Sequence, residues 1–219
     1  MNFCISTDSG ADLPLSYCQQ HAITVLPLGF TMEGRTYHGS EAMDNKTFYE
    51  KLRAGALPTT SAANPEDTAA LFRRFMEKGQ DLLHIAFSSG LSSTSDAAQI
   101  AAQTVMEEYP QRKILVVDSL CASMGQGFLV HQAMKLRDAG ATLEDAAKKI
   151  TDMRLNVVHN FTVDDLGHLH RGGRVSKATA VVGSLMGIKP ILHVDDEGHL
   201  TAVGKVRGRK ASIQALADR

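Results

Sequence analysis

The chain has 219 residues, of which 43% are hydrophobic and 21% are charged, and its net charge is −1. These values are ordinary for a globular protein with enough residues for one large domain or two small ones. A nearly neutral chain without a basic tract has no general attraction to nucleic acid, so we expect no nucleic-acid partner. No apolar run approaches the roughly 20 residues needed to cross a bilayer.

The N-terminus and the cysteines bear on location. Residues 1–6 have no basic residue before their apolar stretch, so they do not resemble a signal peptide. The cysteines are Cys4, Cys18 and Cys121, which are odd in number and lack the spacing of a metal site. We interpret them as reduced thiols and expect a cytoplasmic protein.

Apolar strands alternate with helices over the first part of the chain. Asn64, Pro65 and the acids Glu66 and Asp67 form a clear helix start, with a capping side chain, a proline in the first turn and favourable charge. We expect strands at residues 2–7, 23–28, 82–87 and 113–118, a hairpin at residues 32–39, and helices at residues 46–54, 65–78, 96–108, 124–139 and 143–154. This alternation predicts an α/β fold with a parallel sheet covered by helices on both faces.

The pattern changes after about residue 156. Residues 157–163 favour a strand, and residues 191–206 favour a β-hairpin with Gly198 in its turn. We therefore expect an N-terminal parallel-sheet α/β domain at residues 1–155 and the start of a second, α+β domain at residues 156–219. In such folds ligands bind at the carboxyl ends of the parallel strands.

Two hydroxyl-rich segments precede helices. In residues 88–95, six of eight side chains carry a hydroxyl, and residues 57–65 hold a second cluster. Hydroxyls and free N–H groups at a helix N-terminus suit an anionic group. Simple capping needs only one such side chain, so for residues 88–95 we favour an anion-binding role. For residues 57–65 an ordinary capped loop is an equally good interpretation.

Basic and histidine-rich segments have a plainer alternative. Residues 169–176 place two arginines around two glycines, and residues 205–210 are a second basic run. Such segments bind phosphate or a partner in some proteins, but they are more often solvated. His168 and His170 form an H-x-H pair, but no acidic or cysteine cluster accompanies them, so we expect no metal site.

These motifs in this order resemble the DegV family of bacterial fatty-acid-binding proteins. The matching segments run nearly from end to end, and the ordered set is specific although each motif alone is weak. They are residues 7–9 with Asp12 and Leu13, residues 58–61, residues 88–92 with Thr94, residues 117–119 with Gly125 and Gly127, Leu166 and Leu169 with residues 172–176, residues 187–192, and residues 205–210.

The chain departs from the family pattern in three respects. Ala62 stands where the family usually has Gln, and Ser93 stands where it usually has Gly. Family members also continue past the basic run at residues 205–210, through elements that complete the second domain and supply a headgroup contact. Because the chain stops at Arg219, we expect the second domain to be incomplete and its pocket to be partly open.

The resemblance implies a lipid-binding protein that is not an enzyme and needs no cofactor. A long-chain fatty acid would lie between the two domains, with its carboxylate held by hydroxyls of Thr60, Ser61, Ser92 and Ser93. The candidate acyl-chain residues are apolar side chains near the motifs, for which a plain core role is an equal alternative. They are Phe30, Phe128, Phe161, Val163, Leu166 and Ile188.

The resemblance also implies a partner. In the family a separate fatty acid kinase phosphorylates the bound lipid, which suggests Arg174, Arg207 and Arg209 as its docking surface. Transient contact with a membrane surface is compatible with this role. Two other functions remain open from the residues alone: a phosphometabolite-binding module, or an enzyme of acyl or phosphoryl transfer that uses a loop serine.

Overall fold

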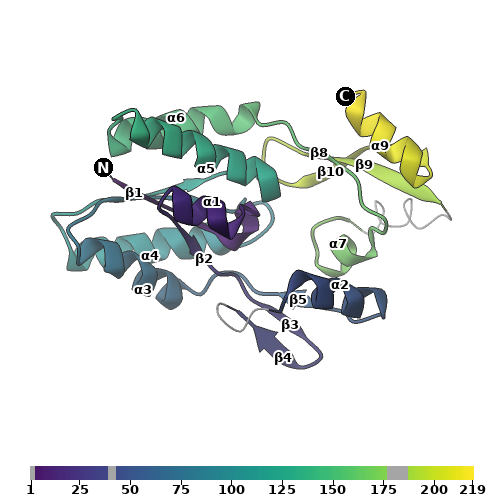
Figure 1. The fold of residues 1–219 in the computed structure, drawn as a ribbon, viewed down its shortest axis with the longest axis horizontal. Coiled ribbons are helices and arrows are strands. Elements are labelled where there is room, and N and C mark those ends of the chain that lie inside the picture. Colours follow the sequence, from purple (N-terminus) through teal and green to yellow (C-terminus); the bar gives the residue numbers. More distant parts are fainter. Residues whose placement is uncertain (1–2, 39–42, 177–186) are drawn as a thin grey trace.

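The structure, a computed structural model, describes residues 3–38, 43–176 and 187–219 (Figure 1). Its centre is a four-stranded parallel sheet in the order β2-β1-β6-β7. The strands are β1 (Cys4–Asp8), β2 (Ile23–Leu26), β6 (Leu82–Ala86) and β7 (Ile114–Asp118). All four overlap the strands expected from the sequence, which confirms the α/β fold class.

Helices cover both faces of this sheet (Figure 1). One face packs on α1 (Leu15–Gln20), α5 (Ser123–Asp138) and α6 (Leu143–Met153). The other face packs on α3 (Pro65–Met76) and α4 (Thr94–Glu108). Because each face meets a helical layer, the strands read as continuous apolar runs, and every residue of β6 is buried.

Local capping chemistry begins two of these helices where the sequence predicts. Asn64 Oδ1 accepts a hydrogen bond from the Glu66 amide at 2.8 Å and so caps α3. Thr142 Oγ1 accepts one from the Asp145 amide at 3.1 Å and caps α6. The sequence did not predict α1, a short helix without a side-chain cap.

A small antiparallel sheet, in the order β4-β3-β5, is separate from the parallel sheet. It consists of β3 (Phe30–Met32), β4 (Arg35–Tyr37) and β5 (Thr59–Thr60), and α2 (Asn45–Arg53) lies beside it in Figure 1. The hairpin expected at residues 32–39 is present but begins earlier, and Gly39 lies outside the described residues. The Phe30 ring stacks on Tyr37, with ring centres 5.1 Å apart, and meets the edge of Phe48 at 5.0 Å.

The C-terminal part forms a third sheet, in the order β10-β9-β8. Its elements are β8 (Asn160–Phe161), α7 (Gly167–Arg171), β9 (Ile188–Val194), β10 (Leu200–Arg207) and α9 (Arg209–Ala217). The expected β9–β10 hairpin is confirmed, with Gly198 in its turn. The strand expected at residues 157–163 shortens to β8, since only Asn160 and Phe161 pair with β9.

The turn of the β9–β10 hairpin docks against the loop that follows β6. Ser88 Oγ donates a buried hydrogen bond of 2.9 Å to the Gly198 carbonyl. Gly198 has φ +80°, and a Cβ there would lie 2.1 Å from Ser88 Oγ, so both conformation and space require glycine. This contact fixes the third sheet against the carboxyl end of the parallel sheet.

Candidate ligand-binding site

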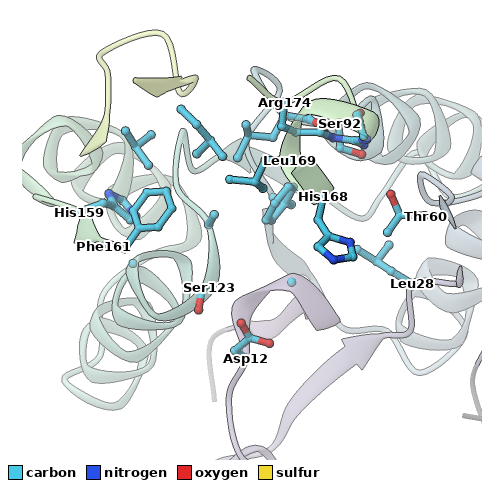
Figure 2. Close-up of a pocket in the computed structure, with 18 of the residues that line it drawn as sticks. Asp12, Leu28, Thr60, Ser92, Ser123, His159, Phe161, His168, Leu169 and Arg174 are labelled. Atoms are coloured by element: carbon cyan, nitrogen blue, oxygen red, sulfur yellow. Dashed lines mark hydrogen bonds between the residues drawn. The ribbon is translucent and has the colours of Figure 1, made fainter. Parts of the chain in front are cut away.

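A cavity of about 1310 Å³ lies at the carboxyl end of the parallel sheet (Figure 2). Segments before α3, after β6, around the start of α5, and from β8 and α7 all contribute to its wall. Its apolar lining side chains are Leu28, Phe48, Leu52, Leu57, Phe87, Leu91, Met124, Phe128, Val157, Val158, Phe161, Leu169, Val194 and Leu200. Such a lining suits a large apolar ligand.

Two aspartates at strand ends hold the loops around this cavity. Asp8 is buried and accepts hydrogen bonds from the amides of Phe87 at 2.7 Å and Gly10 at 2.9 Å. Burial raises the pKa of Asp8, although these amides and the Gln126 side chain oppose the shift. Asp118 Oδ1 accepts the Ser89 and Leu120 amides, both at 3.1 Å. These carboxylates are therefore structural caps of the loops.

Hydrogen bonding orients the hydroxyl of Ser92. Ala63 N–H donates to Thr94 Oγ1 at 3.2 Å, which ties the two hydroxyl-rich segments together. Ser92 Oγ accepts the Thr94 amide at 3.2 Å and lies 2.9 Å from Thr94 Oγ1. A hydroxyl has one proton and two lone pairs, so when Thr94 donates to Ser92, the Ser92 proton is free for another acceptor. Ser92 lines the cavity and can present that proton to a ligand.

The structure brings three of the four predicted headgroup residues to this cavity. Thr60, Ser61 and Ser92 line it, with Thr60 carried by β5, which pairs with β3 at Phe30, and Ser61 held by its amide on the Gly29 carbonyl at 3.1 Å. Ser93 is the N-cap residue of α4 and lies outside the lining.

The predicted acyl-chain residues divide into two groups. Phe128 and Phe161 line the cavity. The other side chains lie outside its lining: Leu166 is buried, while Phe30, Val163 and Ile188 are half-buried. For Phe30 the contacts with Tyr37 and Phe48 show a packing role in the small sheet.

The predicted basic residues also differ in position. Arg174 lines the cavity, and its Nε donates to the Leu91 carbonyl at 3.0 Å, so it contacts the loop that carries Ser92. Arg207 is exposed at the end of β10. Arg209 begins α9, with its guanidinium 3.9 Å from Asp164. Arg207 and Arg209 lie outside the cavity lining.

His168 is a lining residue whose role the sequence did not indicate. Figure 2 shows its ring on the same side of the cavity as Thr60 and Leu28. Arg171 approaches His168 Nδ1 at 3.1 Å, and a guanidinium can only donate, so Nδ1 is the acceptor. In the neutral ring Nε2 then carries the proton, and it is a donor available to a ligand.

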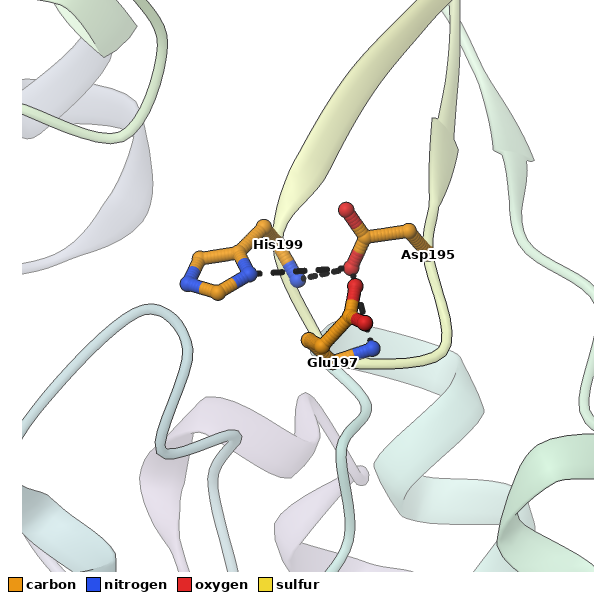
Figure 3. Close-up of side chains that lie close together, drawn as sticks. All are labelled: Asp195, Glu197 and His199. Atoms are coloured by element: carbon orange, nitrogen blue, oxygen red, sulfur yellow. Dashed lines mark hydrogen bonds and ion pairs between the residues drawn. The ribbon is translucent and has the colours of Figure 1, made fainter.

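A group of acidic and histidine side chains lies outside the cavity, in the β9–β10 turn (Figure 3). Asp195, Glu197 and His199 could together approach a metal ion. However, Asp195 Oδ1 accepts the Glu197 and His199 amides at 3.2 and 2.8 Å, and Oδ2 accepts the Thr201 hydroxyl at 3.1 Å. These bonds explain the aspartate as the residue that stabilises the turn.

Comparison with known proteins identifies the family. The family model described as "Uncharacterised protein, DegV family" matches residues 2–219. The chain belongs to the DegV family. This confirms the resemblance inferred from the ordered motifs.

Among the described residues, no helix is both long and apolar enough to cross a membrane.

Curated DegV relatives match the whole chain. A DegV domain-containing protein of Lactococcus lactis is 44% identical over 221 residues, which cover 100% of this chain and 76% of the relative. Protein DegV of Bacillus subtilis is 36% identical over 222 residues, with the same coverage.

Solved DegV structures share the fold. A DegV family protein of Thermus thermophilus, described by its fatty acid binding, superposes with a TM-score of 0.87 at 34% identity and covers 100% of this chain and 76% of its own. DegV of B. subtilis, described as a fatty acid binding protein, gives 0.85 at 35% identity with the same coverage. A stearic acid-binding protein of Eubacterium ventriosum gives 0.90 at 26% identity, covering 99% and 74%.

Proposed function

We propose that this DegV-family chain binds one long-chain fatty acid in the cavity, with the carboxylate at the hydroxyls of Thr60, Ser61 and Ser92 and with Ser93 at the start of α4, outside the lining. The observation that carries the proposal is the cavity itself, in which an apolar wall continues to the hydroxyls of Thr60 and Ser61 before α3 and of Ser92 before α4. The fatty acids named for solved relatives at 34% and 35% identity support the same ligand class.

The chemistry of the two ends matches a fatty acid. Each buried methylene contributes about 0.8 kcal/mol, so a long chain supplies more than about 10 kcal/mol before ordering costs. With Thr94 as donor to Ser92, the carboxylate would accept the Ser92 proton and hydrogen bonds from Thr60 and from the start of α4, where the helix dipole favours an anion. Hydroxyl and amide donors hold the carboxylate without neutralising it, so its oxygen stays nucleophilic.

His168 is a further donor in this proposal. Arg171 leaves the Nε2 proton of a neutral His168 available, and the ring lies on the Thr60 side of the cavity (Figure 2). It would therefore donate to the carboxylate from the side of Thr60. Leu28 lies beside this position in Figure 2 and would contact the first methylenes.

The proposed lipid would lie between the two domains predicted from the sequence, at residues 1–155 and 156–219. Headgroup hydroxyls come from the first segment, whereas His159, Phe161, Leu169 and Arg174 come from the second. Such a protein would act in the cytoplasm and exchange its lipid by transient contact with a membrane surface.

The chain would present its lipid to a kinase rather than act on it. Ser92 Oγ has Thr94 as its hydrogen-bond partner, and no histidine or carboxylate bonded to it is found in the part of the chain that the structure describes. An activated serine needs such a base. We therefore propose a separate fatty acid kinase as partner, with Arg174 at the cavity and Arg207 and Arg209 outside it as its docking residues.

The alternative of a phosphometabolite-binding module fits the cavity less well. A small phosphate ester needs a compact polar pocket, whereas this cavity is mostly apolar and larger than about 1,000 Å³, the upper range of ordinary ligand sites. The α4 N-terminus would suit a phosphate, so the headgroup chemistry alone does not separate the two functions.

Mass spectrometry of the organic extract from the purified chain tests the proposal. We expect a fatty acid in a ratio near one per chain, and displacement of a fluorescent fatty acid by unlabelled palmitic acid. The absence of extracted lipid, together with no uptake of the fluorescent fatty acid, would contradict lipid binding. Retention of a phosphorylated metabolite would favour the alternative.

A further inference from the structure

The end of the cavity away from the proposed headgroup site contains a histidine, His159, that the proposed headgroup binding does not involve. Figure 2 shows His159 and Phe161 together at one end, away from Thr60 and His168 at the other. The first turn of α5, residues 122–125, lines the cavity near this far end. An imidazole is therefore part of a wall that otherwise consists largely of apolar side chains and backbone.

Contact with Gly125 fixes the position of the His159 ring. A Cβ added to Gly125 would lie 1.9 Å from His159 Nε2, 2.6 Å from Cε1 and 2.8 Å from Cδ2. All three distances are shorter than real carbon contacts, so any larger residue at position 125 would push the ring away. The His159 ring thus occupies the space that a side chain at position 125 would fill.

The backbone of His159 is anchored as well. Its carbonyl lies 2.9 Å from His193 Nδ1, and the neighbouring pair Asn160 and His193 joins β8 to β9. The ring can therefore leave its place mainly by side-chain rotation, and rotation away from Gly125 would bring it toward the cavity.

Stability does not explain a histidine at this position. Both ring nitrogens are buried, and neither has a hydrogen-bond partner among the described residues. Burial lowers the pKa of His159, and polar contacts with the backbone of Val157 and Ala122 offset only part of this shift. The ring is therefore buried without a hydrogen-bond partner of full geometry, and a buried polar group of this kind calls for a specific role.

We infer that His159, seated on Gly125, forms the end wall of the acyl-chain site and determines the longest chain that the cavity accepts. The inference rests on the proposed fatty-acid function and specifies the ligand class of that same site. Removing the ring would lengthen the site, whereas adding a methyl group to Gly125 would move the ring inward and shorten it. The two changes should alter the length of the site in opposite directions, because both act on the contact between His159 and Gly125.

Competition binding with a ladder of saturated fatty acids, from lauric to arachidic acid, tests this inference. We expect His159→Ala to shift the preferred ligand to a longer acid, with a gain of about fourfold for each added methylene that finds room. Gly125→Ala should shift the preference to a shorter acid by a similar factor. The double variant should lose the shortening that Gly125→Ala causes alone, since the ring that clashes is absent.

A ring-retaining variant controls for folding and polarity. His159→Phe keeps a ring on Gly125 and should keep the parent's length preference. If Gly125→Ala does not fold, as judged by circular dichroism, the comparison of His159→Ala with His159→Phe still decides the question. An unchanged length profile in His159→Ala, with binding intact, would overturn the inference and leave fatty-acid binding standing. Failure of the parent chain to bind any acid of the ladder would instead overturn the proposed function.

Discussion

The parallel sheet β2-β1-β6-β7 and the C-terminal antiparallel sheet β10-β9-β8 are built differently. The parallel sheet is covered by helices on both faces, so its strands are buried and its loops start from a rigid base. In the C-terminal sheet, β10 is exposed at most of its positions and β8 pairs over only two residues. The loop that carries Ser92 therefore starts from the parallel sheet, while the C-terminal sheet supplies a more exposed wall of the cavity. Changes in the two sheets should accordingly have different effects.

Truncation of core side chains should give the largest difference in stability between the two sheets. Leu83 in β6 is fully buried, and Leu83→Ala should lower the free energy of unfolding by about 2–5 kcal/mol. Val203 in β10 is 41% exposed, and Val203→Ala should change it by less than about 0.5 kcal/mol. Urea denaturation measures both. Equal losses would show that the antiparallel sheet carries as much of the core as the parallel one.

Removing the headgroup hydroxyls should affect binding and spare stability. Thr60→Ala and Ser92→Ala should each weaken fatty-acid binding by about 1–3 kcal/mol, because a carboxylate loses a charge-assisted hydrogen bond. Ser89→Ala is a matched control, since Ser89 is an exposed residue of the same loop that does not line the cavity. Titration of a fluorescent fatty acid measures the affinity. A Thr60/Ser92 double variant that binds like the parent would place the headgroup elsewhere.

The contact between the sheets should have an intermediate effect. Ser88→Ala leaves the buried Gly198 carbonyl without its donor, so stability should fall by about 1 kcal/mol. The hairpin turn would then hold the loop of Ser92 less firmly, so affinity for palmitic acid should fall while that for the corresponding alcohol stays nearly constant. Parallel losses for both ligands would mean that Ser88 acts only on general stability.

His168 should make a smaller, headgroup-specific contribution. It is exposed at the cavity, so His168→Phe should weaken palmitic acid binding by about 0.5–1.5 kcal/mol, the range of a typical hydrogen bond. His168→Gln keeps a donor and should recover part of the loss. A phenylalanine variant that binds as tightly as the parent would remove His168 from the carboxylate site.

Charge reversal on the basic surface should leave lipid affinity almost unchanged. Arg207→Glu with Arg209→Glu should slow phosphorylation by a cognate fatty acid kinase, and the difference from the parent should shrink as salt rises, because exposed charges are screened. Lys148→Glu on α6 is the control, since this lysine is exposed and lies outside the cavity lining. Normal phosphorylation of the arginine variants would exclude the docking role, and joint loss of lipid binding would favour a structural one.

Local chemistry made much of the fold predictable. The capping of α3 by Asn64, the capping of α6 by Thr142 and the apolar strands all depend on residues close together in the chain, and each appears where expected. The turn at Gly198 is similar, because glycine at φ +80° suits a tight hairpin. The ordered motifs also determined the family, which the family model confirms. The domain boundary at residues 155–156 stays a prediction.

Only the tertiary structure decided which polar side chains face the cavity. Six hydroxyls in residues 88–95 look alike in sequence, yet of these only Ser92 lines the cavity, while Ser88 bonds to Gly198 and Thr94 to Ala63. β5 was missed because its two residues are a strand only through pairing with β3. His159 lies on Gly125 from 34 positions further along the chain, and no local pattern records such a contact. Packing between distant segments determines these features, because it selects among side chains that local propensity treats as equivalent.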